Sequence, residues 1–97
     1  MKQGFSPAAR LELVEATQWY LDEGGAALAA RFERDITRAI QLLALMPGIG
    51  SPNYHGVRTW PLKDFPYTLV YRMVDDSLTV VAVAHQSRKP GYWVGPG

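Results

Sequence analysis

The sequence predicts a single α+β domain, in which a helix hairpin packs against an antiparallel β-sheet. Apolar residues recur at three- and four-residue spacing through the first half of the chain, and three short runs rich in Val, Tyr, Thr and Leu follow in the second half. The length of 97 residues, with 47% hydrophobic and 20% charged residues, is enough for one hydrophobic core. We therefore expect residues 1–97 to form one domain.

The first predicted helix begins at Ser6 and Pro7. A serine hydroxyl can accept a hydrogen bond from an early backbone N–H, and a proline at the first helical position gives up only a donor that has no partner there. Gly24 and Gly25 end the helix, because glycine adopts the left-handed backbone that closes a last turn. Glu12 lies off the apolar face. That face consists of Leu13, Ala16, Thr17 and Tyr20.

A second predicted helix follows directly and ends before Pro47 and Gly48. Two helices joined by so short a break can only fold back as an antiparallel hairpin, and each has a single apolar face that needs a further partner. The strands that follow must supply this partner. The apolar face of the second helix consists of Leu28, Phe32, Ile36, Ala39, Ile40 and Leu43.

Three strands are predicted after a loop at residues 49–56 that shows no periodicity. They cover residues 57–62, 67–74 and 78–85, and short polar turns separate them. Because the connections are tight, the strands form an antiparallel meander. The last strand is apolar on both faces, which is typical of an interior strand rather than an edge strand.

The amino-acid composition indicates in which compartment the protein works and which metal sites it can form. The chain has no cysteine, which excludes a disulfide framework and a thiolate metal site, and its two histidines cannot assemble a zinc site. No apolar run approaches the roughly 20 residues that a membrane span needs. We therefore expect a soluble cytoplasmic protein with no membrane partner, no metal and no cofactor.

The sequence carries no strong sign of a nucleotide or nucleic-acid ligand. Gly48 and Gly50 lack the third glycine and the preceding strand of a dinucleotide loop, and no Gly-Lys-Ser/Thr phosphate loop occurs. The formal net charge is +1, of which residues 1–49 carry −1 and residues 50–97 carry +2. This mild basicity permits contact with nucleic acid but is far below that of a dedicated binder. We also expect no small-molecule substrate.

Five features, in their order along the chain, resemble the RelE/ParE superfamily of bacterial toxins. They are the helix hairpin, Pro-x-x-Gly at residues 47–50, an arginine at position 58, Phe-Pro-Tyr-x-Leu-Val-Tyr-Arg at residues 65–72, and Val-Ala-His-x-x-Arg-x-Pro-Gly-Tyr-Trp at residues 83–93. The resemblance covers residues 5–93. Such proteins are the toxin half of a type II toxin-antitoxin pair and are often described as plasmid stabilisation proteins.

The resemblance implies a fold and a partner. The fold is α+β, with the helix hairpin packed on one face of a twisted antiparallel sheet of three to four strands and the other face partly open as a groove. It includes a short strand before the first helix, for which residues 2–5 are the available segment. The partner is a cognate antitoxin, whose flexible segment would lie against the hairpin or the open sheet face, as a helix or as an added strand.

The segment after the last strand holds most of the candidate functional side chains. His85 could transfer a proton near neutral pH in an RNA-cleaving toxin, or could hydrogen-bond a backbone group at the strand end. Arg88 could clamp a phosphate or pair with a carboxylate of a partner, or form an internal salt bridge. Tyr92 and Trp93 could stack on bases or grip a partner, or fold back as a lid over the core.

Arg58 and Arg72 lie inside predicted strands, where an unpaired charge is costly to bury. Each either lines the open sheet face or pairs internally, and alternation along the strand favours the open face for Arg72. We expect Arg58, Arg72, His85, Arg88 and Tyr92 to border that face together. The aromatic residues expected to pack in the core are Trp60, Phe65, Tyr67 and Tyr71.

Two mechanisms remain open. Members similar to RelE cut messenger RNA in the ribosomal A site, whereas members similar to ParE inhibit DNA gyrase without known nuclease chemistry. Only Tyr92 matches a residue that the RelE branch uses for catalysis, and donors that stabilise the developing phosphate charge are missing. The positions that lack the basic residues of that branch are Thr59, Pro61, Thr68 and Gln86.

We therefore expect a ParE-like inhibitor that binds gyrase, with a ribosome-dependent mRNA endonuclease as the alternative. For the inhibitor, the target-binding residues would be Arg58, Arg72, Arg88, Tyr92 and Trp93. For the endonuclease, the catalytic residues would be His85, Arg88 and Tyr92.

Overall fold

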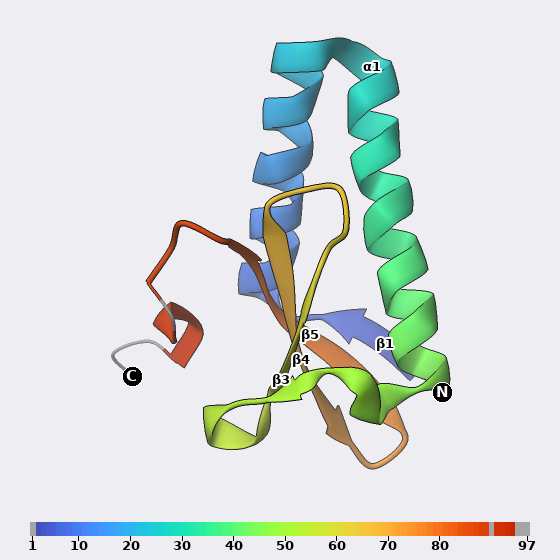
Figure 1. The fold of residues 1–97 in the computed structure, drawn as a ribbon, viewed down its shortest axis with the longest axis vertical. Coiled ribbons are helices and arrows are strands. Elements are labelled where there is room, and N and C mark those ends of the chain that lie inside the picture. The colour runs from blue at the N-terminus through green and yellow to red at the C-terminus, as the bar shows by residue number, and fades with distance from the viewer. Residues whose placement is uncertain (1, 90, 95–97) are drawn as a thin grey trace.

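The computed structural model describes residues 2–89 and 91–94, which form one α+β domain (Figure 1). The helical element is α1 (Pro7–Leu45). The strands are β1 (Lys2–Phe5), β2 (Ser51–Pro52), β3 (Arg58–Pro61), β4 (Tyr67–Val74) and β5 (Ser77–His85). Single 3₁₀ turns cover Pro47–Ile49, Tyr54–Gly56 and Tyr92–Val94. Within the described residues, no helix is long and apolar enough to cross a lipid bilayer.

The two predicted helices form one helical element that is folded sharply in the middle. Gly25 has φ 82° and ψ −178°, a conformation that is accessible essentially only to glycine. The two halves of α1 therefore run antiparallel as a hairpin without a separate loop between them (Figure 1). The sequence predicted the hairpin, its two helices and its turning point, since the non-helical Gly25 separates the two helical halves of α1.

The start of α1 agrees with the prediction and also ties the helix to the sheet. The Ser6 hydroxyl accepts a hydrogen bond from the Ala9 N–H at 3.1 Å and donates one to the Val81 carbonyl at 3.0 Å. The Ser6 N–H donates to the Val80 carbonyl at 2.9 Å. One residue thus caps the helix and fixes its first turn over β5.

The sheet has five strands in the order β1-β5-β4-β3-β2. This corrects the prediction of a three- to four-stranded antiparallel sheet, because β1 pairs parallel with β5 while the other neighbours pair antiparallel. Strand β1 lies at residues 2–5, as the family resemblance implied, and β5 is an interior strand as predicted. Strand β2 escaped the sequence analysis because it is only two residues long and contains Pro52.

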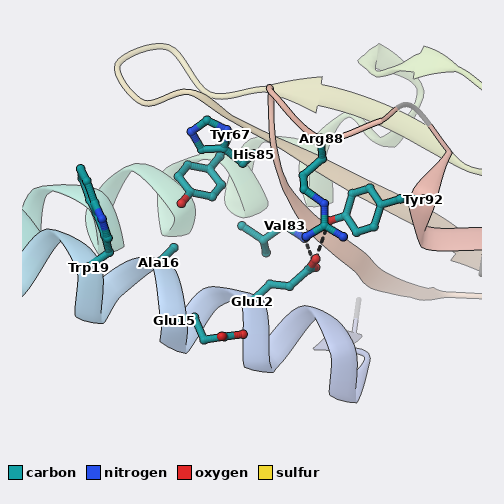
Figure 2. A pocket seen from close by; sticks show the side chains of 9 residues that line it. All are labelled: Glu12, Glu15, Ala16, Trp19, Tyr67, Val83, His85, Arg88 and Tyr92. Carbon is teal, nitrogen blue, oxygen red and sulfur yellow. Dashed lines mark hydrogen bonds between the residues drawn. The ribbon is translucent and has the colours of Figure 1, made fainter.

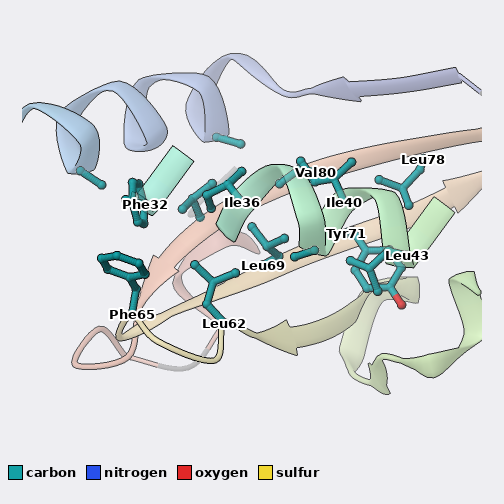
Figure 3. Close-up of a cluster of buried hydrophobic side chains, with 14 of the residues drawn as sticks. Phe32, Ile36, Ile40, Leu43, Leu62, Phe65, Leu69, Tyr71, Leu78 and Val80 are labelled. Carbon is teal, nitrogen blue, oxygen red and sulfur yellow. The ribbon is translucent and has the colours of Figure 1, made fainter. Parts of the chain in front are cut away.

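The main core lies between α1 and one face of the sheet (Figure 3). Both predicted helix stripes point into it, although Leu13 and Leu28 are only partly buried. The predicted aromatic packing is also present: Phe65 and Tyr71 are buried in this core, and Trp60 and Tyr67 pack against it while partly exposed. The fully buried centre includes Phe32, Leu43, Leu69, Tyr71 and Val80.

Tyr71 connects β4 to the loop that follows α1. Its Oη donates to the Pro47 carbonyl at 2.6 Å and accepts a hydrogen bond from the Gly50 N–H at 3.1 Å. Arg58, which lies opposite Tyr71 in β3, donates from Nη1 to the Gly50 carbonyl at 2.8 Å and to the Gly48 carbonyl at 3.3 Å. The backbone of the Pro-x-x-Gly segment, called the loop socket below, therefore binds the side chains of two strand residues, Arg58 and Tyr71.

The opposite face of the sheet carries a second, smaller core. Its buried members come from residues near or within β3, β4 and β5, and the segment after β5 packs over them. This segment thus covers part of the sheet face that α1 leaves open. The buried members are Val57, Val70, Ala82 and Ala84, with Val81, Tyr92 and Trp93 packed against them.

Candidate functional site

The candidate site is formed by the segment that follows β5, which the backbone turns back along the sheet. His85 lies opposite Tyr67 at the end of β5. The Arg88 N–H then donates to the His85 carbonyl at 2.9 Å, and the Tyr92 N–H donates to the Lys89 carbonyl at 3.3 Å. These two turns place the Arg88 and Tyr92 side chains next to each other.

Glu12 on α1 anchors this segment from the side of the helix (Figure 2). Its Oε1 accepts a hydrogen bond from the Val83 N–H at 2.9 Å, and its Oε2 accepts one from the Tyr92 hydroxyl. The Val83 N–H is available because β1 ends at Phe5, whose partner in β5 is Val80. A single carboxylate therefore holds together the helix, the sheet and the C-terminal segment.

Arg88 lies flat against Tyr92. The guanidinium carbon is 4.0 Å from the centroid of the phenol ring, which is close cation–π geometry. Burial raises the pKa of Tyr92 above its ordinary value of 10.0, and the hydrogen bond to Glu12 raises it further, while the neighbouring Arg88 charge opposes the shift. The phenol therefore stays protonated at neutral pH and acts as a donor to Glu12.

His85 is held by its own turn. Its Nδ1 accepts a hydrogen bond from the Ser87 N–H at 3.1 Å and lies 2.7 Å from the Ser87 hydroxyl. The imidazole packs edge-on against the Tyr67 ring, with centroids 5.1 Å apart. Because a backbone N–H can only donate, Nδ1 is the acceptor in this contact.

Two adjoining cavities share His85, Arg88 and Tyr92. The helix-side cavity, of about 250 Å³, is completed by Glu12, Glu15, Ala16, Trp19, Tyr67 and Val83 (Figure 2). The sheet-side cavity, of about 190 Å³, is completed by Thr59, Thr68, Ala84, Gln86, Lys89 and Trp93. Beyond the three shared residues, the helix-side cavity has the acidic residues Glu12 and Glu15 in its lining, whereas the charged residue in the lining of the sheet-side cavity is Lys89.

The structure brings together four of the six side chains proposed from the sequence and separates the other two. The sheet-side cavity is lined by His85, Arg88, Tyr92 and Trp93. Trp93 also packs on the smaller core, as expected of a lid. The expectation that all the cationic candidates border the open sheet face is wrong for Arg58, which lies on the helix-covered side. Arg72 points to the open face, as predicted, but lies far from the cavity.

Strand geometry explains this separation. Arg58 lies opposite Tyr71, on the helix-covered side of the sheet, and its guanidinium is used in the loop socket. Arg72 is exposed and follows Tyr71 directly, so it points to the opposite face. It is also five residues from Tyr67, or about 17 Å along the strand from the His85 end.

Sequence reasoning missed Glu12, which was expected only to lie off the apolar stripe. Its partner Tyr92 is 80 positions away, so no local pattern could pair them. A weak signal existed in the spacing, because Glu12 precedes the stripe residue Ala16 by one helical turn and both line the same cavity. In the described part of the chain, no three His, Asp or Glu side chains gather closely enough to hold a metal ion.

Comparison with known proteins identifies the class and then the family. One chain of a solved structure described as "Chromosomal ParDE TA system from P. aeruginosa" has the same fold, with a TM-score of 0.76 and 22% sequence identity; the match covers 88% of this chain and 95% of that one. The profile of the ParE toxin of the type II toxin-antitoxin system parDE matches residues 4–90. The chain therefore belongs to the ParE toxin family. No curated protein matches this sequence.

Proposed function

We propose that this chain is the toxin of a type II toxin-antitoxin module, that a cognate antitoxin neutralises it, and that it acts by binding and inhibiting DNA gyrase. Membership of the ParE toxin family supports the first part. The second part is supported by the solved structure of similar fold, which is described as a toxin-antitoxin system. The choice of binding over catalysis rests on the state of the ionisable side chains at the site.

The observation that carries the binding mechanism is the engagement of Tyr92 and His85 with the protein itself. Tyr92 donates a hydrogen bond to Glu12 and has a raised pKa, so it is a poor acid and a poor base near neutral pH. The Nδ1 of His85 is occupied by the Ser87 N–H. Arg88 has one face on the Tyr92 ring. This arrangement favours a rigid recognition surface over proton transfer.

The sheet-side cavity has neutral side chains at three positions where the RelE branch carries basic residues, which supports the same choice. Cleavage of a phosphodiester builds charge on its non-bridging oxygens, and each missing preorganised donor costs about 2.7–4 kcal/mol of barrier. Thr59, Thr68 and Gln86 supply only neutral groups there. The three residues of the alternative endonuclease, His85, Arg88 and Tyr92, do line one cavity, which is the observation that keeps that reading as the second candidate.

The antitoxin is proposed to cover apolar side chains that α1 leaves exposed. Leu11 is 60% exposed, Val14 is 59% exposed and Leu45 is 81% exposed. A partner helix or strand that covers them would also restrain the toxin. We expect the chain expressed alone to inhibit growth or to precipitate, and co-expression with the neighbouring small reading frame to relieve both. Normal growth under strong expression of the chain alone would argue against an active toxin.

The test of the target uses two reactions with the purified protein. In the first, gyrase supercoils relaxed plasmid in the presence of increasing toxin. In the second, translating ribosomes receive the same toxin, and the ends of the messenger RNA are mapped. The proposal predicts loss of supercoiling with intact messenger RNA. Cleavage within the A-site codon, with gyrase unaffected, would establish the endonuclease instead.

A further inference from the structure

The sheet-side cavity is lined by cations and hydrogen-bond donors. Arg88 and Lys89 are both exposed and contribute two positive charges. The hydroxyls of Thr59 and Thr68 and the amide of Gln86 can each donate a hydrogen bond. No Asp or Glu is among the described residues that line this cavity. Such a lining matches a ligand that carries negative charge and several acceptor atoms.

Trp93 contributes its aromatic ring to the same lining. Its indole Nε1 is buried and has no hydrogen-bond acceptor among the described residues. Buried polar groups in folded proteins are nearly always hydrogen-bonded, and an orphaned donor is unfavourable. Because Nε1 is buried, a ligand in the cavity would meet the ring of Trp93 rather than this nitrogen.

Arg88 is held in place before any ligand arrives. Its guanidinium stacks on the Tyr92 ring at 4.0 Å, and Tyr92 is fixed by its hydrogen bond to Glu12. Stacking uses the face of the guanidinium and leaves its N–H edge able to donate. Glu12 lines the helix-side cavity but not the sheet-side one, so the anchoring carboxylate does not line the cavity that carries the cations.

We propose that the sheet-side cavity binds a phosphate group of a nucleic-acid strand. The donors converge from β3 (Thr59), from β4 (Thr68) and from the C-terminal segment (Arg88, Lys89). A phosphate presents oxygens in several directions and meets such a set better than a planar carboxylate does. The Tyr92 and Trp93 rings at the cavity give a base a surface on which to stack.

This inference rests on the proposed function in one respect only: both candidate targets carry a nucleic acid. Gyrase acts on DNA, and the ribosome holds messenger RNA. A phosphate site would let the toxin recognise either target in its loaded state. The binding test needs neither target, so its failure and a failure to inhibit gyrase can be told apart.

The test measures binding of a short fluorescein-labelled DNA, single-stranded and duplex, by fluorescence anisotropy over a series of salt concentrations. Binding should weaken as salt rises, because each neutralised phosphate releases counterions. Lys89→Gln should weaken binding severalfold and reduce the salt slope by about one. Thr68→Val should weaken binding about fivefold through loss of one hydrogen bond. Inorganic phosphate should compete at high concentration, and less well than the strand.

The matched controls remove the same groups away from the cavity. Lys2→Gln deletes an exposed positive charge in β1, and Thr79→Val deletes a hydroxyl in β5 opposite Arg72. Both should bind DNA as the unchanged chain does. The proposal fails if DNA does not bind at low salt, or if Lys2→Gln weakens binding as much as Lys89→Gln. It also fails if an oligoglutamate peptide binds in place of DNA with the same dependence on Lys89, which would assign the cavity to an acidic protein partner.

Discussion

Two tyrosines, one within β4 and one in the segment after β5, use the same hydroxyl chemistry for different purposes. Tyr71 is fully buried beneath α1, and its hydroxyl joins the Pro47 carbonyl to the Gly50 N–H. Tyr92 is half-buried on the C-terminal segment, and its hydroxyl donates to Glu12. The Tyr71 contacts stabilise the core, whereas the contact of Tyr92 with Glu12 holds the Arg88 guanidinium in position at a cavity. A residue's type therefore does not reveal whether it serves the fold or the site; its burial and its partner do.

The same contrast separates the arginines. Arg58 satisfies two loop carbonyls beside Tyr71, and Arg88 stacks on Tyr92 with its edge open to a ligand. Changes around Tyr71 should lower stability, and changes around Tyr92 should lower function with little effect on stability.

The largest effect is expected at Gly50, in the loop socket. A Cβ at this position would lie 2.8 Å from Tyr71 Cε1 and 3.0 Å from the Thr59 carbonyl, and neither atom is free to move. We expect Gly50→Ala to lower the free energy of unfolding by about 2–4 kcal/mol, through overpacking and disturbed hydrogen bonds. Urea denaturation followed by circular dichroism measures this change.

Gly48→Ala is the matched control for that substitution. A Cβ at Gly48 would meet nothing within 4 Å, so the free energy of unfolding should change by less than about 0.5 kcal/mol. Equal losses in the two variants would show that the loop, rather than the Tyr71 contact, decides stability.

Removal of each tyrosine hydroxyl compares the two tyrosines directly. Tyr71→Phe leaves a buried N–H and a carbonyl without a partner, which should cost about 1–3 kcal/mol of stability. Tyr92→Phe leaves only a carboxylate that water can reach, and it should cost less than about 1 kcal/mol. Thermal and urea unfolding of both variants measure the difference. The division between fold and site would be wrong if Tyr92→Phe proved the more damaging.

Arg88→Ala should reduce gyrase inhibition about tenfold without loss of stability. Arginines stacked at a recognition surface are typical binding hot spots, and this one is exposed and held in position by Tyr92. The toxin concentration that halves supercoiling gives the measurement. Arg38→Ala removes an exposed arginine from α1 and serves as the control, for which we expect no change. An equal loss of inhibition in both variants would show that the overall charge of the protein, rather than Arg88 itself, determines inhibition.

The smallest effect is on the pH dependence of stability. The pKa of Tyr92 is raised by folding, so this contribution to stability is fully present below its unfolded pKa of about 10 and is lost as pH rises toward the folded value. Urea midpoints measured between about pH 8 and pH 11 should therefore fall above pH 10. The fall should be shallower in Tyr92→Phe, and an unchanged slope would show that Tyr92 titrates freely in the folded state.

Much of the fold could be predicted because its signals are local. The Ser6-Pro7 cap, the two apolar stripes and the turning point at Gly25 each depend on a few neighbouring residues. Strand β2 could not be predicted, since two residues carry no periodicity. The parallel pairing of β1 could not be derived either, because it depends on where α1 returns the chain to the sheet.

The candidate site could be predicted only where its residues lie close together in the sequence. His85, Arg88, Tyr92 and Trp93 lie close together in sequence, so the end of one strand was enough to gather them. Arg58 could equally have faced either side of its strand, and only the register with Tyr71 decides its place. Contacts between distant segments, such as that between Glu12 and Tyr92, depend on packing that no local pattern encodes.

One supercoiling experiment tests the separation of fold and site most directly. Purified Tyr71→Phe and Tyr92→Phe are compared with the unchanged chain in gyrase inhibition, at a temperature where all three are folded. The account predicts that Tyr71→Phe inhibits at the same concentration as the unchanged chain, and that Tyr92→Phe needs about fivefold more, the equivalent of one hydrogen bond. Full inhibition by Tyr92→Phe together with a loss in Tyr71→Phe would contradict it.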